Sequence, residues 1–232
     1  MTTSSKGNAI LIGASGGIGG ALLAALIAQN GYDQVLPLSR SSDPPLDLLN
    51  EASIAEAANW AASQGDIRLV IDATGFLHDR QFQPEKSWKQ LDPAHMATAF
   101  DINAAGPALL MKHFLPLLPR EGRSVFATLS AKVGSIGDNA LGGWYSYRAS
   151  KAALNQFVRT AAVELRRRAP QAICVSLHPG TVETDLSSPF HKTGLAVRPP
   201  AEAAQALLSV INGLQPDQSG GFYDYTGQPL SW

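Results

Sequence analysis

Residues 8–19 read NAILIGASGGIG, and this stretch decides the fold of the chain. Residues 8–13 are a short apolar run, which predicts a buried parallel strand. Residues 18–30 are rich in Ala and Leu and predict a helix, with Gly31 as the residue that closes it. Glycines with the spacing G-x-x-x-G-x-G join the two. A strand, a glycine-rich turn and a helix in this order indicate the beginning of an α/β domain.

The same alternation of strand and helix continues along the chain. Further strands are predicted at residues 34–39, 67–73, 124–129, 172–177 and 221–225, and further helices at residues 51–63, 93–118, 144–168 and 200–212. Pro37 favours an edge position for the second strand, and Pro107 predicts a kink in its helix. Without a repeat or a linker, the pattern predicts a single domain of the Rossmann type, with a doubly wound parallel sheet and helices on both faces. Ligands of such folds bind at the carboxyl ends of the strands.

Composition narrows the range of functions. The 232 residues carry a net charge of -1, which argues against a nucleic-acid-binding surface. No apolar run approaches the roughly 18 residues of a membrane span, so no membrane partner is expected. Residues 1–7 are polar and predict a disordered N-terminus without a signal peptide, ahead of a single catalytic domain over residues 8–232. The single cysteine, Cys174, excludes an internal disulfide, is expected in the core, and fits a reducing, cytoplasmic location.

The glycine loop predicts a binding site for a dinucleotide. Glycines allow a tight turn and a close approach of the backbone to a pyrophosphate, and the following helix directs its free N–H groups at that anion. The alternative is a glycine-rich turn that only packs the helix against the strand.

The end of the second strand predicts the choice of cofactor. An NAD-dependent enzyme usually carries an acidic residue there, whereas this chain has Ser39, Arg40 and Ser41. An arginine with two hydroxyls could hold the 2′-phosphate of NADP, so NADP is expected and NAD is less favoured. A solvated surface arginine is the alternative. Asp47 could reach the adenine edge, or it could be a helix N-cap or loop residue.

Tyr147 and Lys151 lie four residues apart, near the start of the predicted helix over 144–168. This spacing places both side chains on one face of a helix. A cation beside a phenol lowers the pKa of the phenol, which would make Tyr147 a general acid or base. An exposed pair on a helix face is the alternative.

These features together resemble the short-chain dehydrogenase/reductase family over essentially the whole chain. The matching parts occur in the family's order: residues 13–19, residues 72–75 (DATG), Asn103, Ser130, Tyr147 with Lys151, and residues 179–184 (PGTVET). Residues 130–136, 142–151 and 178–184 resemble the C-factor-like branch, which is named for a cell–cell signalling protein and also holds carbonyl-reductase-like members.

The resemblance implies the roles of individual residues. Asn103 would hold a water that relays protons to Lys151, although it could instead cap a helix break before Pro107. Asp72 and Thr74 depart from the family's pattern, which leaves the strand contacts there open. The expected catalytic residues are Asn103, Ser130, Tyr147 and Lys151. The expected cofactor-binding residues are Gly13, Ser15, Gly17, Ile18, Gly19, Ser39, Arg40, Asp47, Ala73, Gly75, Asn103, Tyr147, Lys151, Pro179, Gly180, Val182 and Thr184.

At the position where the family usually carries its catalytic serine this chain has Ala131, so two other serines are candidates for the role. Ser130 closes the strand that ends at residue 129, and Ser135 lies further along the following loop. A hydroxyl at the rim of a sheet is better fixed than one on a loop, so Ser130 is favoured over Ser135.

The sequence therefore predicts an NADP-preferring oxidoreductase that transfers a hydride between a nicotinamide and a carbonyl or alcohol substrate. The alternative is a cofactor-binding regulator or signalling protein of the same fold with little turnover. The five histidines share no metal-ligand spacing, so no metal is expected, and His178 is interpreted as structural. Residues 185–199 are expected to form a substrate lid. The resemblance, together with apolar residues on several faces of the two long helices, predicts a homodimer or homotetramer.

Overall fold

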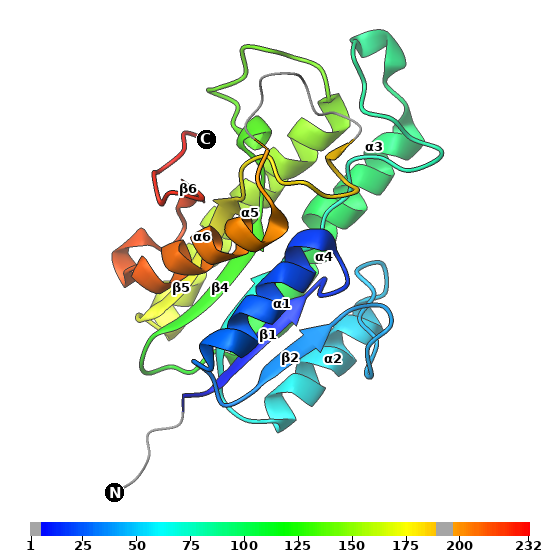
Figure 1. Cartoon of the computed structure of the whole chain (residues 1–232). Coiled ribbons are helices and arrows are strands. Elements are labelled where there is room, and N and C mark those ends of the chain that lie inside the picture. Colours follow the sequence, from blue (N-terminus) through cyan, green and yellow to red (C-terminus); the bar gives the residue numbers. More distant parts are fainter. Residues whose placement is uncertain (1–5, 189–196) are drawn as a thin grey trace, which may run out of the picture.

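The computed structural model describes residues 6–188 and 197–232. Its centre is a six-stranded parallel sheet with the strand order β2-β1-β3-β4-β5-β6 (Figure 1). The strands are β1 (Asn8–Ile12), β2 (Val35–Leu38), β3 (Ile67–Asp72), β4 (Ser124–Leu129), β5 (Ala172–His178) and β6 (Phe222–Asp224). Each predicted strand is present, and the doubly wound, Rossmann-type fold is confirmed.

Helices cover both faces of this sheet (Figure 1). One face packs on α1 (Gly17–Gln29) and α6 (Pro200–Gly213), where Leu22 and Leu207 meet Leu11 of β1. The other face packs on α2 (Glu51–Ser63), α4 (Gly106–Phe114) and α5 (Tyr145–Arg168), which meet Ile10 of the same strand. Successive side chains of a strand point to opposite faces, so one apolar strand serves both cores.

The helix predicted over residues 93–118 is interrupted, which corrects the prediction of one kinked helix. It consists of α3 (Pro93–Phe100), a π-helical turn η2 (Asp101–Ala105), α4, and a 3-10 turn η3 (Leu115–Leu117). Pro107 lies in the first turn of α4, where its missing N–H costs little. The interruption of the helix therefore lies about one turn before Pro107, in the π-helical turn that contains Asn103.

Three further predictions concern single residues, one after α1, one in β2 and one in β5. Asn30, and not Gly31, takes the left-handed conformation after α1, with φ 49°; asparagine tolerates this conformation better than most residues. Pro37 lies in β2, which is an edge strand as predicted. Cys174 is fully buried in β5, as expected for a core thiol.

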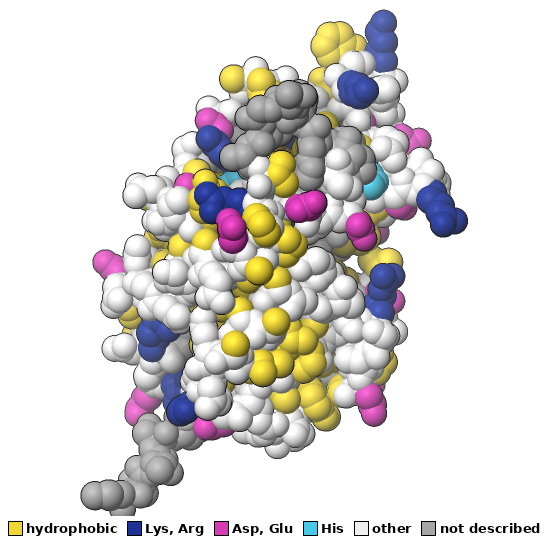
Figure 2. Space-filling model, viewed as in Figure 1, with side chains coloured by type: hydrophobic (Ala, Val, Ile, Leu, Met, Phe, Trp, Pro, Cys, Tyr) yellow, Lys and Arg dark blue, Asp and Glu magenta, His cyan; other side chains and the backbone are white. Residues whose placement is uncertain are grey.

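On the face visible in Figure 2, charged side chains of both signs are scattered, while hydrophobic side chains gather over α1. The sequence of α1 contains no charged residue. Within residues 6–188 and 197–232, no helix combines the length and the apolar character needed to cross a bilayer.

Candidate active site

Two cavities lie at the carboxyl ends of the strands, where the fold predicts ligands. The first, of about 490 Å³, is lined by Gly13, Ser15, Ser39, Arg40, Asp47, Ala73 and Gly75. The second, of about 410 Å³, is lined by Ile18, Ser130, Tyr147, Pro179, Gly180, Val182 and Thr184. Most of the predicted site residues thus line either a cavity at the glycine loop or a cavity around Tyr147, whereas Gly17, Gly19, Asn103 and Lys151 line neither.

The glycine loop has the backbone geometry that glycine alone supplies. Gly13 has a φ of +82°, and a Cβ atom on Gly19 would lie 2.0 Å from the carbonyl oxygen of Gly13. A Cβ atom on Gly17 would lie 2.8 Å from Cγ2 of Thr184, so the loop packs directly on the segment after β5. Gly16 offers α1 no side-chain cap. This cradle suits a pyrophosphate, because the N–H groups of the first helical turn remain available to an anion.

The proposed cofactor-selecting residues lie at the mouth of the same cavity. The Ser39 and Ser41 hydroxyl oxygens are 3.1 Å apart, and Arg40 is exposed beside them. Asp47 Oδ1 accepts a hydrogen bond from the backbone N–H of Leu49 at 3.0 Å, while Asn50 caps α2. Asp47 therefore holds a turn and also lines the cavity, and it is not the helix N-cap.

Lys151 and Tyr147 lie one turn apart on α5, with Lys151 Nζ 6.0 Å from the centre of the phenol ring. Lys151 is buried, and its Nζ donates a hydrogen bond to the carbonyl oxygen of Leu129 at 2.8 Å. Burial lowers the pKa of Lys151 to about 8, and the charge of Asp72 partly offsets this effect.

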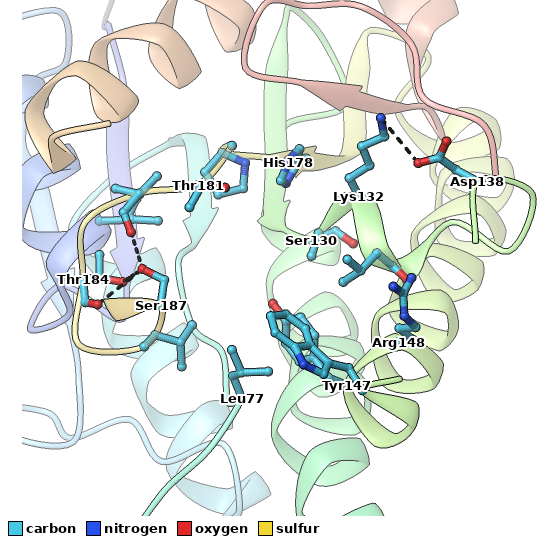
Figure 3. A pocket seen from close by; sticks show the side chains of 18 of the residues that line it. Leu77, Ser130, Lys132, Asp138, Tyr147, Arg148, His178, Thr181, Thr184 and Ser187 are labelled. Carbon is cyan, nitrogen blue, oxygen red and sulfur yellow. Dashed lines mark hydrogen bonds and ion pairs between the residues drawn. The ribbon is translucent and has the colours of Figure 1, made fainter. Parts of the chain in front are cut away.

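The expected lowering of the Tyr147 pKa is wrong for this structure. Loss of solvation raises the pKa of Tyr147 to about 12, because the charged phenolate is disfavoured away from water. Tyr147 is only partly buried, and its hydroxyl points into the cavity (Figure 3). At neutral pH the group is therefore a protonated phenol that can donate a hydrogen bond and a proton.

Asn103 joins the loop after β3 to α5. Its Oδ1 accepts from the backbone N–H of Phe76 at 2.8 Å, and its Nδ2 donates to the Phe76 carbonyl at 2.7 Å and to Ser150 Oγ at 3.1 Å. A Cβ atom on Gly75 would lie 3.7 Å from Asn103 Oδ1 and 3.8 Å from Lys151 Nζ. Asn103, Gly75 and Lys151 therefore meet, and the Asn103 side chain braces the loop.

Asp72 and Thr74 make the strand contacts that their departure from the family pattern left open. The buried Asp72 carboxylate accepts from the Thr74 backbone N–H at 3.0 Å and from Thr74 Oγ1 at 2.5 Å. It also accepts from Thr128 Oγ1 at 2.6 Å, and Thr128 is its partner in the ladder between β3 and β4. These hydrogen bonds tie the two strands together beside Lys151.

The two candidate serines lie in different places. Ser130 lines the cavity of Tyr147, and its Oγ donates to Asn155 Oδ1 at 2.7 Å. Ser135 is not among the residues that line this cavity, and its Oγ accepts from the Asp138 N–H and lies 3.3 Å from Ser231 Oγ. The structure brings Ser130 together with Tyr147 and turns Ser135 toward the C-terminal segment.

The walls of the cavity include apolar side chains from three separate segments of the chain. Leu77, Val133, Leu141, Trp144 and Leu186 supply apolar surface. In Figure 3 the side chains from the segment after β5 lie across the cavity from Tyr147 and Ser130. Residues 189–196 of the expected lid lie outside the described residues.

The sequence did not point to two side chains at this site, and a third, His178, was interpreted only as structural. Asn155 holds Ser130, Glu85 holds the first turn of α5, and His178 lines the cavity. The sequence position of Asn155 could have indicated a place at the site, since it lies one turn after Lys151 on the same helix. Glu85 lies in a loop without periodicity, so nothing in the sequence connects it to α5.

Comparisons with known proteins identify relatives of this chain. A family model described as enoyl-(acyl carrier protein) reductase matches residues 19–207. The chain is 40% identical over 143 residues to "C-signal" of Myxococcus xanthus, covering 61% of this chain and 81% of that protein. It is 32% identical over 190 residues to "1-hydroxy-2-glutathionyl-2-methyl-3-butene dehydrogenase" of Rhodococcus sp. strain AD45, covering 82% of this chain and 80% of that protein.

A solved structure extends the similarity to the whole fold. The NADPH-bound carbonyl reductase from chicken fatty liver superposes with a TM-score of 0.85 at 26% identity, covering 98% of this chain and 99% of that chain. The family model covers most of the chain, and the second relative and the structural neighbour extend the similarity over more than four fifths of it. The chain therefore belongs to the short-chain dehydrogenase/reductase family of oxidoreductases.

Proposed function

We propose that the chain is an NADP-preferring reductase of carbonyl compounds, or, in the reverse direction, a dehydrogenase of the corresponding alcohols. The observation that carries this proposal is the protonated Tyr147 hydroxyl, which points into an apolar cavity beside buried Lys151 and the glycine cradle. NADP(H) bound at the cradle would supply or accept the hydride. The NADPH-bound neighbour from chicken supports the choice of a nicotinamide cofactor.

Tyr147 holds the proton that the reaction moves. In the direction of reduction, its hydroxyl donates a hydrogen bond to the carbonyl oxygen and then gives up its proton as negative charge develops there. The raised pKa keeps the phenol loaded with this proton at neutral pH. Lys151 holds a positive charge one turn away, which stabilises the phenolate once the proton has left.

Ser130 is proposed as the second donor to the substrate oxygen. Its single proton points to Asn155 Oδ1, while Nδ2 of Asn155 is buried without a partner in the described part of the chain. If the Asn155 amide turns over, Nδ2 donates to Ser130 Oγ and the serine proton becomes free for the substrate. Asn103 and Lys151 complete the proposed set of catalytic residues, and both are proposed to act on the cofactor side of the substrate.

Oxidation of NADPH with a panel of aldehydes, ketones and quinones tests the proposal. Tyr147→Phe should lower turnover by about 100-fold or more, the usual scale of general acid catalysis, while NADPH binding survives. Tyr145→Phe, two residues earlier on the same helix, is the matched control. Unchanged turnover in Tyr147→Phe would assign the acid to another residue.

A pair of serine variants tests the second donor in the same assay. Ser130→Ala should lower kcat by roughly 10-fold to 1000-fold, through loss of one donor to the developing negative charge. Ser135→Ala should be nearly silent, because that hydroxyl lies outside the cavity. The reverse ranking would transfer the role to Ser135.

A further inference from the structure

Most charged side chains around the Tyr147 cavity are already committed to partners. Lys132 Nζ lies 3.4 Å from Asp138 Oδ2 in an ion pair. Arg148 donates to the carbonyl oxygens of Gly143 at 3.0 Å and of Val133 and Gly142 at 3.2 Å. Lys132 and Arg148, the Lys and Arg residues among the described lining residues, thus already contact protein partners, which makes the cavity better suited to an uncharged ligand than to an anion.

His178 is a polar side chain in this cavity that has no hydrogen-bond partner in the described part of the chain. It is the last residue of β5, and Figure 3 shows it beside Ser130 and Lys132. Its Nδ1 is buried and unpaired. Its Nε2 also has no partner but is not among the buried unpaired atoms, so it is the ring nitrogen that is open to the cavity.

The surroundings of His178 determine where its proton lies. Burial lowers the pKa of His178 to about 4; Lys132 adds to this effect and Asp224 opposes it, so the ring is neutral at neutral pH. A neutral imidazole carries one N–H. A buried N–H without an acceptor is rarer and more costly than a buried lone pair, so the proton belongs on Nε2. His178 thus offers one neutral hydrogen-bond donor to the cavity.

We propose that His178 determines substrate specificity by donating a hydrogen bond from Nε2 to a second, uncharged oxygen of the substrate. This inference rests on the proposed function, in which Tyr147 and Ser130 take the reacting carbonyl oxygen. The remaining wall is mainly apolar, as Leu77, Val133 and Leu186 illustrate. The cavity therefore selects neutral dicarbonyl compounds over monocarbonyl compounds of the same length.

Binding to the NADP⁺-loaded protein tests this selection without requiring turnover. Calorimetry compares 2,3-hexanedione, 2-hexanone and 2-oxohexanoate with the unmodified chain, His178→Phe and His178→Gln. His178→Phe keeps a ring but removes the donor, and should weaken the dione relative to the monoketone by roughly 3-fold to 10-fold, the contribution of one neutral hydrogen bond. His178→Gln retains an N–H donor and should restore part of this preference.

A matched variant separates His178 from a second uncommitted side chain. The hydroxyl of Thr181 also lines the cavity, and Thr181→Val should leave the dione preference unchanged. If Thr181→Val removes the preference and His178→Phe does not, or if 2-oxohexanoate binds more tightly than the dione, the proposal is wrong.

Nitrogen-15 NMR of the histidine side chains tests the tautomer directly. The His178 signals should show a neutral ring protonated on Nε2 at neutral pH; a charged ring or a proton on Nδ1 would overturn the inference.

Failure of the proposed function and failure of the His178 proposal give different results. A chain that binds the dione through His178 but never oxidises NADPH contradicts only the proposed function. A chain that reduces both ketones with the same selectivity in His178→Phe contradicts only the role of His178.

Discussion

At the scale of single residues, the choice of cofactor depends on Arg40. The guanidinium is exposed at the mouth of the cradle and follows Ser39, where an NAD-dependent enzyme would carry a carboxylate. NADPH should therefore bind about tenfold more tightly than NADH or better, which corresponds to about 1.4 kcal/mol. Arg40→Asp should reverse much of this preference, because a carboxylate repels the 2′-phosphate and accepts from a 2′-hydroxyl. Calorimetric titration with both cofactors measures the ratio.

Arg167→Asp makes the same change of charge at an exposed position on α5 and serves as the control. Equal affinities for NADPH and NADH in the unmodified chain would contradict the assignment of Arg40.

Asp72 is expected to set the pH range over which Lys151 stays charged. Its carboxylate is buried on the strand next to β4 and raises the pKa of Lys151 against the effect of burial. Asp72→Asn removes the charge but can still accept from Thr74 and donate to Thr128. The pKa of Lys151 should then fall below about 8, and the loss of reductase activity with rising pH should begin at lower pH. The pH dependence of kcat/KM measures this shift.

Thr128→Val is the matched control for Asp72→Asn. It removes a hydrogen bond to Asp72 and keeps the charge, so it should lower stability without moving the pH profile. Superimposable pH profiles for Asp72→Asn and the unmodified chain would show that the carboxylate only stabilises the pairing of β3 with β4.

At the scale of elements, α5 begins without a cap of its own. Its N-cap residue, Trp144, has a φ of 52° and its side chain does not cap the helix. Glu85 supplies the cap from a distant loop: its backbone oxygen accepts from the Trp144 N–H at 2.5 Å, and its carboxylate accepts from the backbone N–H of Ser146 at 3.2 Å and from the Ser146 hydroxyl. His95 Nδ1 lies 3.3 Å from the same carboxylate.

Glu85→Ala should therefore destabilise the turn that presents Tyr147. The substitution leaves Ser146 without its acceptor and removes a negative charge from a helix N-terminus, so the free energy of unfolding should fall by about 1–3 kcal/mol. Urea denaturation measures the change. Lys86→Ala, at an exposed neighbouring position, should have little effect; an equal loss of stability in both variants would contradict the capping role of Glu85.

Such long-range caps explain which parts of the structure could be predicted from the sequence. Strand β4 and helix α2 have the predicted boundaries because apolar patterning and local caps determine them. The π-helical turn around Asn103 could not be predicted, since it depends on contacts with Phe76 across the fold. The Tyr147 pKa was misjudged for a related reason: spacing on a helix shows the neighbouring lysine but does not show burial.

At the scale of the whole molecule, α4 and α5 lie side by side on one face of the sheet, and their outer surfaces enclose an apolar groove of about 440 Å³. Met111 and Leu115 contribute to it from the α4 side, and Phe157 and Ala161 from α5. Phe157 is 44% exposed, although it is a large apolar side chain. A surface of this kind on a lightly charged chain is typical of a contact between subunits.

We propose that two copies of the chain pair through this groove, and Phe157→Glu should weaken that pairing. A carboxylate at the centre of an apolar contact loses its hydration without gaining a partner, which costs several kcal/mol in each copy. The molar mass from light scattering should therefore be lower for Phe157→Glu than for the unmodified chain at the same concentration. Ile27→Glu places the same charge on α1, on the opposite face of the sheet, where Ile27 is 60% exposed. If that variant dissociates and Phe157→Glu does not, the subunits pair through α1 and not through α4 and α5.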